Sequence, residues 1–229
     1  MAVYAIADLH LSLGTDKPMD VFPGWEGYLA RLESNWRKLI EPTDMVVIPG
    51  DVSWAMNLEN AEADFAFLHG LPGRKLLLKG NHDYWWCTRR KMDAYLAEKG
   101  FHSLTIVHND AVAVDAEHAV CGTRGWFFDA EEDADKKVLL REVGRLNASL
   151  DAAAKMGKKP IVFLHYPPVV GGTECPELMQ ALRDRGIDTC DYGHIHGPGI
   201  RSAQNGEYSG IHFRLISADA LHFCPFKIL

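Results

Sequence analysis

Five short apolar runs along the chain each end in a group of polar residues. The clearest run covers residues 74–78, where three consecutive leucines indicate a buried strand, and Gly80 then permits a sharp turn of the backbone. Proteins of the α/β class bind ligands at the carboxyl ends of such strands. The pattern therefore predicts strands with polar ends at residues 3–7, 45–48, 74–78, 161–164 and 189–192.

The segments between these runs repeat their apolar positions every three to four residues, which is the period of an amphipathic helix. Residues 25–40 and 57–68 show this spacing, so we expect each to form a helix that returns the chain to a parallel strand. Three further helices are predicted: one after Thr88, a long one over residues 133–155, and one that Pro176 opens.

Two regions depart from the alternation of strand and helix. Residues 104–107, 112–115 and 119–122 are short and rich in β-formers, and we expect them to form an antiparallel meander. Residues 211–217 and 221–223 are expected to form a hairpin. The chain therefore predicts a mixed α/β architecture in which two sheets pack face to face, helices lie outside them, and the polar strand ends meet at one edge.

Length and composition favour one soluble domain. The 229 residues, 47% of them hydrophobic, can bury a substantial core, and we expect a single domain over residues 1–229. The apolar start of the chain reaches Asp8 and His10 too soon for a secretory signal. No run approaches the roughly 20 apolar residues that a membrane span needs, so we expect a cytoplasmic protein without a membrane partner.

Composition argues against two other classes of site. The five cysteines include no Cys-x-x-Cys pair and lie outside the polar clusters, so we expect reduced, mostly buried thiols. The formal net charge of −7 lacks the basic footprint that long nucleic acid requires, and the few short basic runs are interpreted as solvated faces.

The polar residues at the strand ends share one property: their side chains offer oxygen or nitrogen and no sulfur. They exceed what a single ion can bind, so two divalent ions that share one carboxylate would use the set more fully. Manganese, iron, zinc, cobalt and nickel all suit these donors. The residues are Asp8, His10, Asp51, Asn81, His82, His165, His194 and His196.

Five blocks in this order resemble the signature of the calcineurin-like metallophosphoesterases. Each block is weak alone, but five in order, each after a predicted strand, make a specific pattern that spans most of the chain. The blocks are Asp8-Leu9-His10, Gly50-Asp51, Gly80-Asn81-His82-Asp83, His165 and Gly193-His194-Ile195-His196.

The resemblance implies a four-layer α-β-β-α sandwich and a role for each matching residue. It implies that Asp51 bridges two metal ions, that His82 protonates the leaving oxygen, and that Asp83 orients the ring of His82. It divides the remaining ligands between the ions, with Asp8, His10 and His196 on one and Asn81, His165 and His194 on the other.

These residues predict an enzyme that hydrolyses a small phosphodiester or phosphomonoester by attack of a metal-bridging hydroxide. A nuclease that acts on short nucleic acid is an alternative, and the acidic charge counts against it. An inactive scaffold on the same fold is a second alternative, although no ligand position has been lost. The chain has no Gly-x-x-x-x-Gly-Lys-Ser/Thr loop for a nucleoside triphosphatase.

The sequence leaves the roles of several residues near the motifs open. Arg124, after a predicted strand, either clamps a phosphate oxygen or forms a surface ion pair. Tyr84, Trp85 and Trp86 either stack on a substrate or pack against the protein, and packing is favoured. Many members of the family have Asp or Gly where this chain has Trp54, which leaves the role of that residue open.

Overall fold

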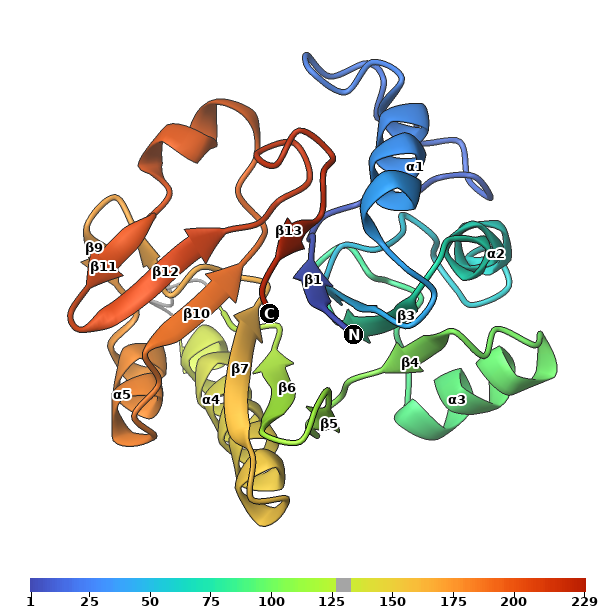
Figure 1. The fold of residues 1–229 in the computed structure, drawn as a ribbon. Helices are drawn as coiled ribbons and strands as arrows, with labels where there is room; N and C mark the ends of the chain where they lie inside the picture. Colours follow the sequence, from blue (N-terminus) through green and yellow to red (C-terminus); the bar gives the residue numbers. More distant parts are fainter. Residues whose placement is uncertain (127–132) are drawn as a thin grey trace.

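A computed structural model of the chain describes residues 1–126 and 133–229, and its strands form two large mixed sheets (Figure 1). The first sheet has the order β13-β1-β2-β3-β4. Strands β1 to β4 run parallel to one another, and β13 pairs antiparallel with β1. The strands are β1 (Val3–Ala5), β2 (Met45–Pro49), β3 (Arg74–Leu78), β4 (Leu104–Ile106) and β13 (Phe226–Lys227).

The second sheet has the order β11-β12-β10-β7-β6-β5, with an antiparallel strand at each edge of a parallel centre. A separate two-stranded ribbon pairs β8 (Val169–Val170) with β9 (Thr173–Glu174). The strands of the second sheet are β5 (Val112–Ala113), β6 (His118–Thr123), β7 (Lys159–Leu164), β10 (Thr189–Tyr192), β11 (Gly206–Tyr208) and β12 (Ile211–Leu215).

Helices cover the outer face of each sheet (Figure 1). Apolar residues of the first three helices share one buried cluster with the first sheet, and residues of α4 and α5 share another with the second sheet. A 3-10 helix, η1, covers Gly197–Ser202. The α-helices are α1 (Tyr28–Leu39), α2 (Glu62–Gly70), α3 (Arg89–Glu98), α4 (Asp133–Lys155) and α5 (Pro176–Asp184).

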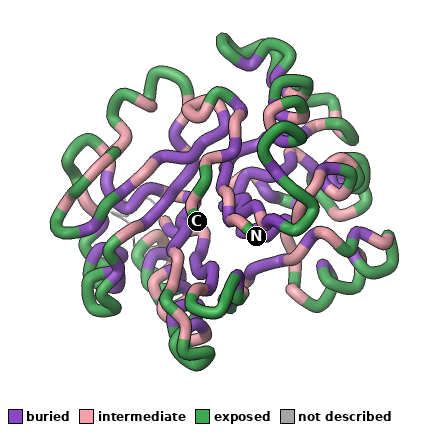
Figure 2. Tube along the Cα trace, in the orientation of Figure 1, coloured by how far each residue is buried: buried purple, intermediate pink, exposed green. Residues whose placement is uncertain are grey.

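Alternation along the strands explains why the two sheets stack. In β2, Val46 and Ile48 face the helices, whereas Val47 lies in the buried cluster between the sheets. In β7, Phe163 lies in that same inner cluster, and its neighbour Val162 faces the helices. Because successive side chains of a strand point to opposite faces, strands that are apolar throughout must be covered on both sides. The predicted architecture of two face-to-face sheets with helices outside is confirmed, and Figure 2 shows the buried strands at its centre.

The expected meander over residues 104–122 is wrong in its first strand. β5 and β6 pair antiparallel, but β4 joins the other sheet and runs parallel to β3. The helix α3 precedes β4, so β3, α3 and β4 form a crossover unit, which brings the next strand back parallel.

The expected hairpin at residues 211–223 is also wrong. β12 pairs with β11 and β10, whereas residues 221–223 form turns. An apolar residue stands in this turn because the ring of Phe223 packs edge-on against Trp25, with ring centroids 5.0 Å apart. A buried anchor in a loop and a strand residue thus give the same local sequence signal.

The helices agree with the predicted segments, with later starts for two of them. The helix expected at residues 25–40 begins at Tyr28, and the helix expected at residues 57–68 begins at Glu62 after a stretch of turns. All five cysteines are free thiols, as expected, and three of them are buried. None of the helices in the described residues combines the length and apolar composition needed to cross a membrane.

Candidate metal centre

The predicted site residues emerge at the carboxyl ends of strands from both sheets. Asp8 follows β1 and Asp51 follows β2 in the first sheet, while His165 and His194 follow β7 and β10 in the second. The two sheets meet at this edge, where the backbone nitrogen of Ala7 donates to the carbonyl oxygen of Ile216 at 2.8 Å. This junction brings together residues that are far apart in the sequence.

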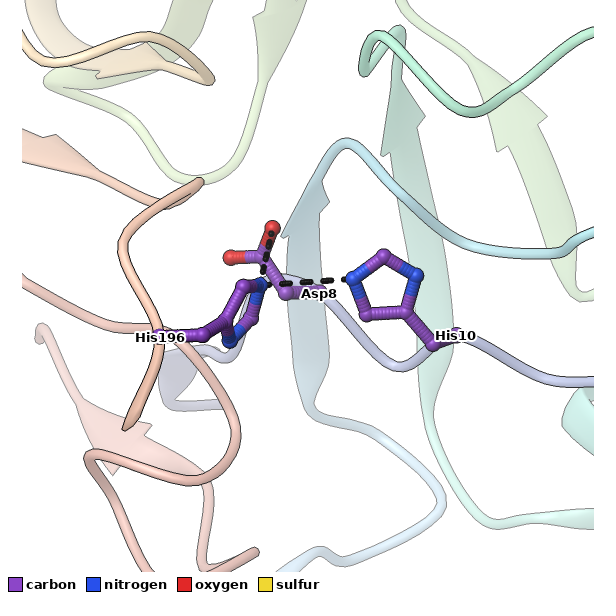
Figure 3. A group of neighbouring side chains, drawn as sticks. All are labelled: Asp8, His10 and His196. Carbon is purple, nitrogen blue, oxygen red and sulfur yellow. Dashed lines mark hydrogen bonds and ion pairs between the residues drawn. The ribbon is translucent and has the colours of Figure 1, made fainter. Parts of the chain in front are cut away.

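The first group of candidate ligands contains Asp8, His10 and His196 (Figure 3). Nε2 of His196 lies 3.3 Å from Nε2 of His10 and 3.4 Å from Oδ1 of Asp8. Asp8 and His10 are buried, and His196 is half-buried. Three potential ligand atoms therefore point at one small region.

The second group contains Asp51, His165 and His194. Nε2 of His165 lies 3.5 Å from Oδ2 of Asp51. The amide oxygen of Asn81 lies 2.6 Å from that same Nε2 and 2.9 Å from Nδ1 of His194. Asn81 thus joins this group as a neutral oxygen donor.

The two groups adjoin through their carboxylates. Oδ2 of Asp51 is 3.7 Å from Nε2 of His10 in the first group, and Oδ1 of Asp8 is 3.7 Å from Nδ1 of His165 in the second. Within each group the ligand atoms lie within 4.8 Å of one another. Of the expected ligands, all seven are brought to one edge of the molecule, with Asp51 between the groups.

The backbone at this edge adopts a conformation that side chains normally avoid. The φ angles are 61° at Asp8, 45° at His10, 51° at Asp51 and 73° at His194, all in the left-handed region. Each such residue costs on the order of 1 kcal/mol, and strain of this kind concentrates at functional sites. Four strained candidate ligands at one edge are hard to explain by packing alone.

Two motif glycines are required by close backbone approach. A Cβ atom at Gly80 would lie 2.1 Å from Oδ1 of Asp51, and one at Gly193 would lie 2.4 Å from Oδ2 of Asp8. Both distances are far below any van der Waals contact. These glycines therefore let the carboxylates of Asp51 and Asp8 sit directly against the neighbouring loops.

Burial and neighbouring charge set the protonation of the cluster. Burial lowers the pKa of His10 and that of His194 to about 3, so both imidazoles are neutral at neutral pH and each keeps one nitrogen without a proton. Burial and the Asp8 carboxylate raise the pKa of Asp51 to about 8. Against the effect of burial, nearby carboxylates raise the pKa of His196 to about 10. Without a metal, protons on Asp51 and His196 thus offset the negative charge of the clustered carboxylates. Divalent cations would replace such protons.

The donor set fits divalent metal ions. Imidazole nitrogens of His10 and His196 face each other at 3.3 Å, and carboxylate oxygens lie beside them, an arrangement that a shared cation satisfies better than hydrogen bonds do. Nδ1 of His10 is buried without a hydrogen-bond partner among the described residues, which leaves Nε2 as the atom that faces the group. Nitrogen and oxygen ligands of this kind suit the borderline divalent ions named above.

The structure gives Asp83 a role other than orienting the ring of His82. Its buried carboxylate accepts hydrogen bonds from the backbone amides of residues 51–53 and of Gly80, at 2.7 to 3.3 Å, and from Nε1 of Trp85 at 2.9 Å. Nδ1 of His82 has no hydrogen-bond partner in the described part of the chain. Asp83 therefore fixes the loop after β2 to the loop after β3, and so positions Asp51.

Two supporting residues were missed in the sequence. Oγ of Ser217 donates to Oδ2 of Asp8 at 2.9 Å, and Oδ1 of Asp219 lies 2.9 Å from Nδ1 of His196. Such contacts orient candidate ligands and raise their basicity. Both residues follow β12, so the rule of polar residues after a strand could have found them if that segment had not been interpreted as a hairpin.

Tryptophan rings pack against the histidines. Trp54 stacks on His10 with centroids 4.9 Å apart, and its centroid is 4.3 Å from that of His82. Trp25 lies edge-on to His10 and His196, with centroids 5.9 and 5.8 Å away. These rings restrict the rotation of the three histidines.

The other aromatic residues near the motif divide between the two interpretations. Trp85 is 2% exposed and packs at right angles to Phe65, so packing is confirmed for it. Trp86 packs partly against the same core. Tyr84 is 51% exposed, and its ring centroid is 6.1 Å from that of His82.

Arg124 is connected to the second group of ligands through its backbone, while its side chain pairs with Glu142. Its guanidinium is 3.4 Å from Oε1 of the buried Glu142 and packs over the ring of Trp126. Its carbonyl oxygen accepts a hydrogen bond from the backbone nitrogen of Tyr166, whose ring contacts His194. Arg124 therefore occupies an ion pair that is largely buried.

Comparison with known families gives one match along most of the chain. A family model described as calcineurin-like phosphoesterase matches residues 1–198. No curated protein matches the sequence.

Solved structures with the same fold share little sequence with this chain. A protein of unknown function from Aquifex aeolicus is similar with a TM-score of 0.55 and 16% identity, over 99% of this chain and 95% of that one. A phosphopantetheinyl hydrolase from Mycobacterium tuberculosis is similar with a TM-score of 0.52 and 14% identity, over 100% of this chain and 95% of that one. At these identities the likeness concerns the fold.

Proposed function

Because the chain belongs to the calcineurin-like phosphoesterase family, we propose that it hydrolyses a small phosphodiester or phosphomonoester with two divalent metal ions. The observation that carries this proposal is the convergence of candidate ligands from both sheets into two adjoining groups. A small phosphorylated substrate also suits the net charge of −7, which disfavours long nucleic acid.

We assign the ligands as two sets that share Asp51. One ion would be held by Asp8, His10, Asp51 and His196, and the other by Asp51, Asn81, His165 and His194. When bound, such ions act as Lewis acids that draw a phosphate group into the site and lower the pKa of coordinated water. The neutral oxygen of Asn81 keeps the protein from cancelling all of the positive charge.

His82 is the proposed general acid. Its half-buried ring lies beside the first group, with a centroid 5.6 Å from that of His10 and 4.3 Å from that of Trp54. Burial lowers the pKa of His82, and the negative charge of a phosphate ester bound nearby opposes that effect. The protonated imidazole can then give its proton to the departing oxygen, which avoids the release of an alkoxide.

Asp83, Ser217 and Asp219 position the groups that touch the metal or the substrate. Asp83 holds the loop of Asp51, Ser217 holds the carboxylate of Asp8, and Asp219 contacts the ring of His196. Substitution of any of them is expected to weaken metal affinity by about 10- to 100-fold while leaving the ligands in place.

Reconstitution of the purified protein tests the proposal. The protein is stripped with a chelator, reloaded with manganese, iron, zinc, cobalt or nickel, and assayed with bis-p-nitrophenyl phosphate and with p-nitrophenyl phosphate. We expect hydrolysis that chelation removes and at least one ion restores, and the ratio of the two rates gives the preference for diester or monoester. Binding of ions without hydrolysis of either ester would contradict the proposed function.

A further inference from the structure

A cavity of about 770 Å³ opens beside the candidate metal centre. Its lining includes the histidines His10, His82 and His196, so it is continuous with the centre. Cavities of this size hold ligands as large as a drug molecule. A phosphate group at the centre fills little of such a space, so the rest of the cavity is available to the organic part of a substrate.

The walls of the cavity away from the histidines are mainly apolar. Met19 and Trp25 are 8% and 3% exposed and form the inner wall together with Trp54. Nε1 of Trp54 lies 3.3 Å from the sulfur of Met19, so this polar atom contacts the protein's own sulfur. Phe22 lines the outer part and is 52% exposed, so much of its ring is left uncovered by the chain.

We propose that this cavity binds an apolar leaving group of the phosphate ester. The inference rests on the proposed function, since it takes His82 as the general acid. A general acid must lie within about 3 Å of the oxygen that it protonates. His82 is both the proposed acid and part of the cavity wall. The alcohol whose oxygen His82 protonates therefore extends into the apolar space, and the enzyme selects esters of alcohols with an aliphatic or aromatic body.

Binding of n-alkylphosphonates tests the cavity without turnover. These compounds keep the phosphoryl group but cannot be hydrolysed, and calorimetry measures their affinity for the metal-loaded protein. We expect the affinity to rise roughly threefold for each methylene from methyl to hexyl, because each methylene is removed from water. An affinity that is independent of chain length would overturn the proposal.

Phe22→Ala and Val21→Ala form a matched pair of variants. Both side chains are exposed and lie in the same loop, but Phe22 lines the cavity and Val21 does not. Phe22→Ala should weaken hexylphosphonate by about three- to tenfold and leave methylphosphonate unchanged, since only the longer chain reaches the ring. Val21→Ala should bind both like the wild type. Equal losses in the two variants would place the alkyl chain outside this cavity.

Competition between two aryl esters tests whether the leaving group of the ester occupies the cavity. Phenyl and 4-tert-butylphenyl esters release phenols of nearly equal acidity, so a difference in kcat/KM reports contact with the leaving group. We expect the tert-butyl ester to be favoured about tenfold or more in the wild type and less in Phe22→Ala. Equal rates with a graded phosphonate series would overturn the leaving-group assignment. Failure of all ester hydrolysis would instead remove the proposed function, and the calorimetric series would still report the cavity.

Discussion

The candidate metal centre has two unlike sides. On the apolar side, formed mainly by Met19, Phe22, Trp25 and Trp54, a cavity of about 770 Å³ borders the first group of ligands, and Arg201 also lines it. On the cationic side, Lys79, Arg124 and Arg145 surround the buried Glu142, and the cavity that they line at the ends of β3 and β6 measures about 20 Å³. The second volume is that of about one water molecule. Of these two sides, as the described residues form them, the apolar side is the one with room for an organic group.

The two arginines of the cationic side already form ion pairs within the protein. Glu142 is fully buried and accepts from Oγ1 of Thr123 at 2.7 Å, and it is paired with both Arg124 and Arg145. A guanidinium held in this way is poorly placed to follow a substrate. The pairing with Glu142 favours the ion-pair interpretation of Arg124 over the phosphate clamp. We therefore expect the apolar side to select the substrate.

The largest predicted effect tests the apolar side through His82. His82→Ala should keep bound metal but lose about 10² to 10⁴ in kcat on alkyl esters, because the alkoxide then departs without a proton. The loss on activated p-nitrophenyl esters should be much smaller. Metal content and kcat on both ester classes check the prediction, with His212→Ala, an exposed histidine on β12, as the control. Equal losses on both classes would remove His82 from the acid role.

The next prediction tests the cationic side. Glu142→Gln removes the charge that faces Arg124 and Arg145, whose side chains are only 18% and 33% exposed. We expect the free energy of unfolding to fall by about 2 to 3 kcal/mol, less than for a fully buried pair because both cations reach some solvent. KM for the ester should change less than about threefold. Denaturant unfolding and steady-state kinetics measure the two effects.

Glu207→Gln, at an exposed position on β11, serves as the matched control and should leave stability unchanged. A stable Glu142→Gln variant with KM raised more than about tenfold would restore the phosphate clamp.

The smallest predicted effect is a change of stability with pH at a buried cation outside the cationic side, Lys75. Lys75 is fully buried, and its ammonium donates to the carbonyl oxygens of Leu71 and Gly73. Burial lowers its pKa to about 8 from a usual value of 10.5. Between these values the unfolded chain binds more protons than the folded chain, so this residue's contribution to unfolding free energy rises with pH.

Lys75→Met should remove this rise. We expect the difference in unfolding free energy between wild type and variant to change by about 1 to 2 kcal/mol in favour of the wild type from about pH 7 to about pH 10. Urea unfolding at several pH values measures it, and activity at neutral pH should be unaffected. A pH-independent difference would mean that Lys75 titrates alike in both states.

The sequence was most informative where chemistry and strand ends coincide. Asp8, Asp51, Asn81 and His165 each follow an apolar run, so a single rule found all four. The layered arrangement also follows from the sequence, because β2 and β7 are apolar on both faces and must be covered by other elements on both sides.

The sequence was least informative where position depends on distant contacts. The carboxylate of Asp83 stands next to His82 in the chain, yet it binds the backbone amides of residues 51–53, which no local pattern could show. β4 looked like part of a meander because its length and composition do not reveal which sheet it joins. The apolar wall from Met19 to Trp25 comes from a loop without periodicity.

Metal content tests the central claim most directly. Wild type and Asp51→Asn are reconstituted with manganese, freed of loose ions, and analysed for bound metal per chain, with Asp188→Asn at an exposed position as the control. We predict about two ions in wild type and control, and at most about one in Asp51→Asn, since the shared carboxylate is lost. A wild type that binds no ion, with manganese or any of the other four metals, or an Asp51→Asn variant that retains both, would contradict the account.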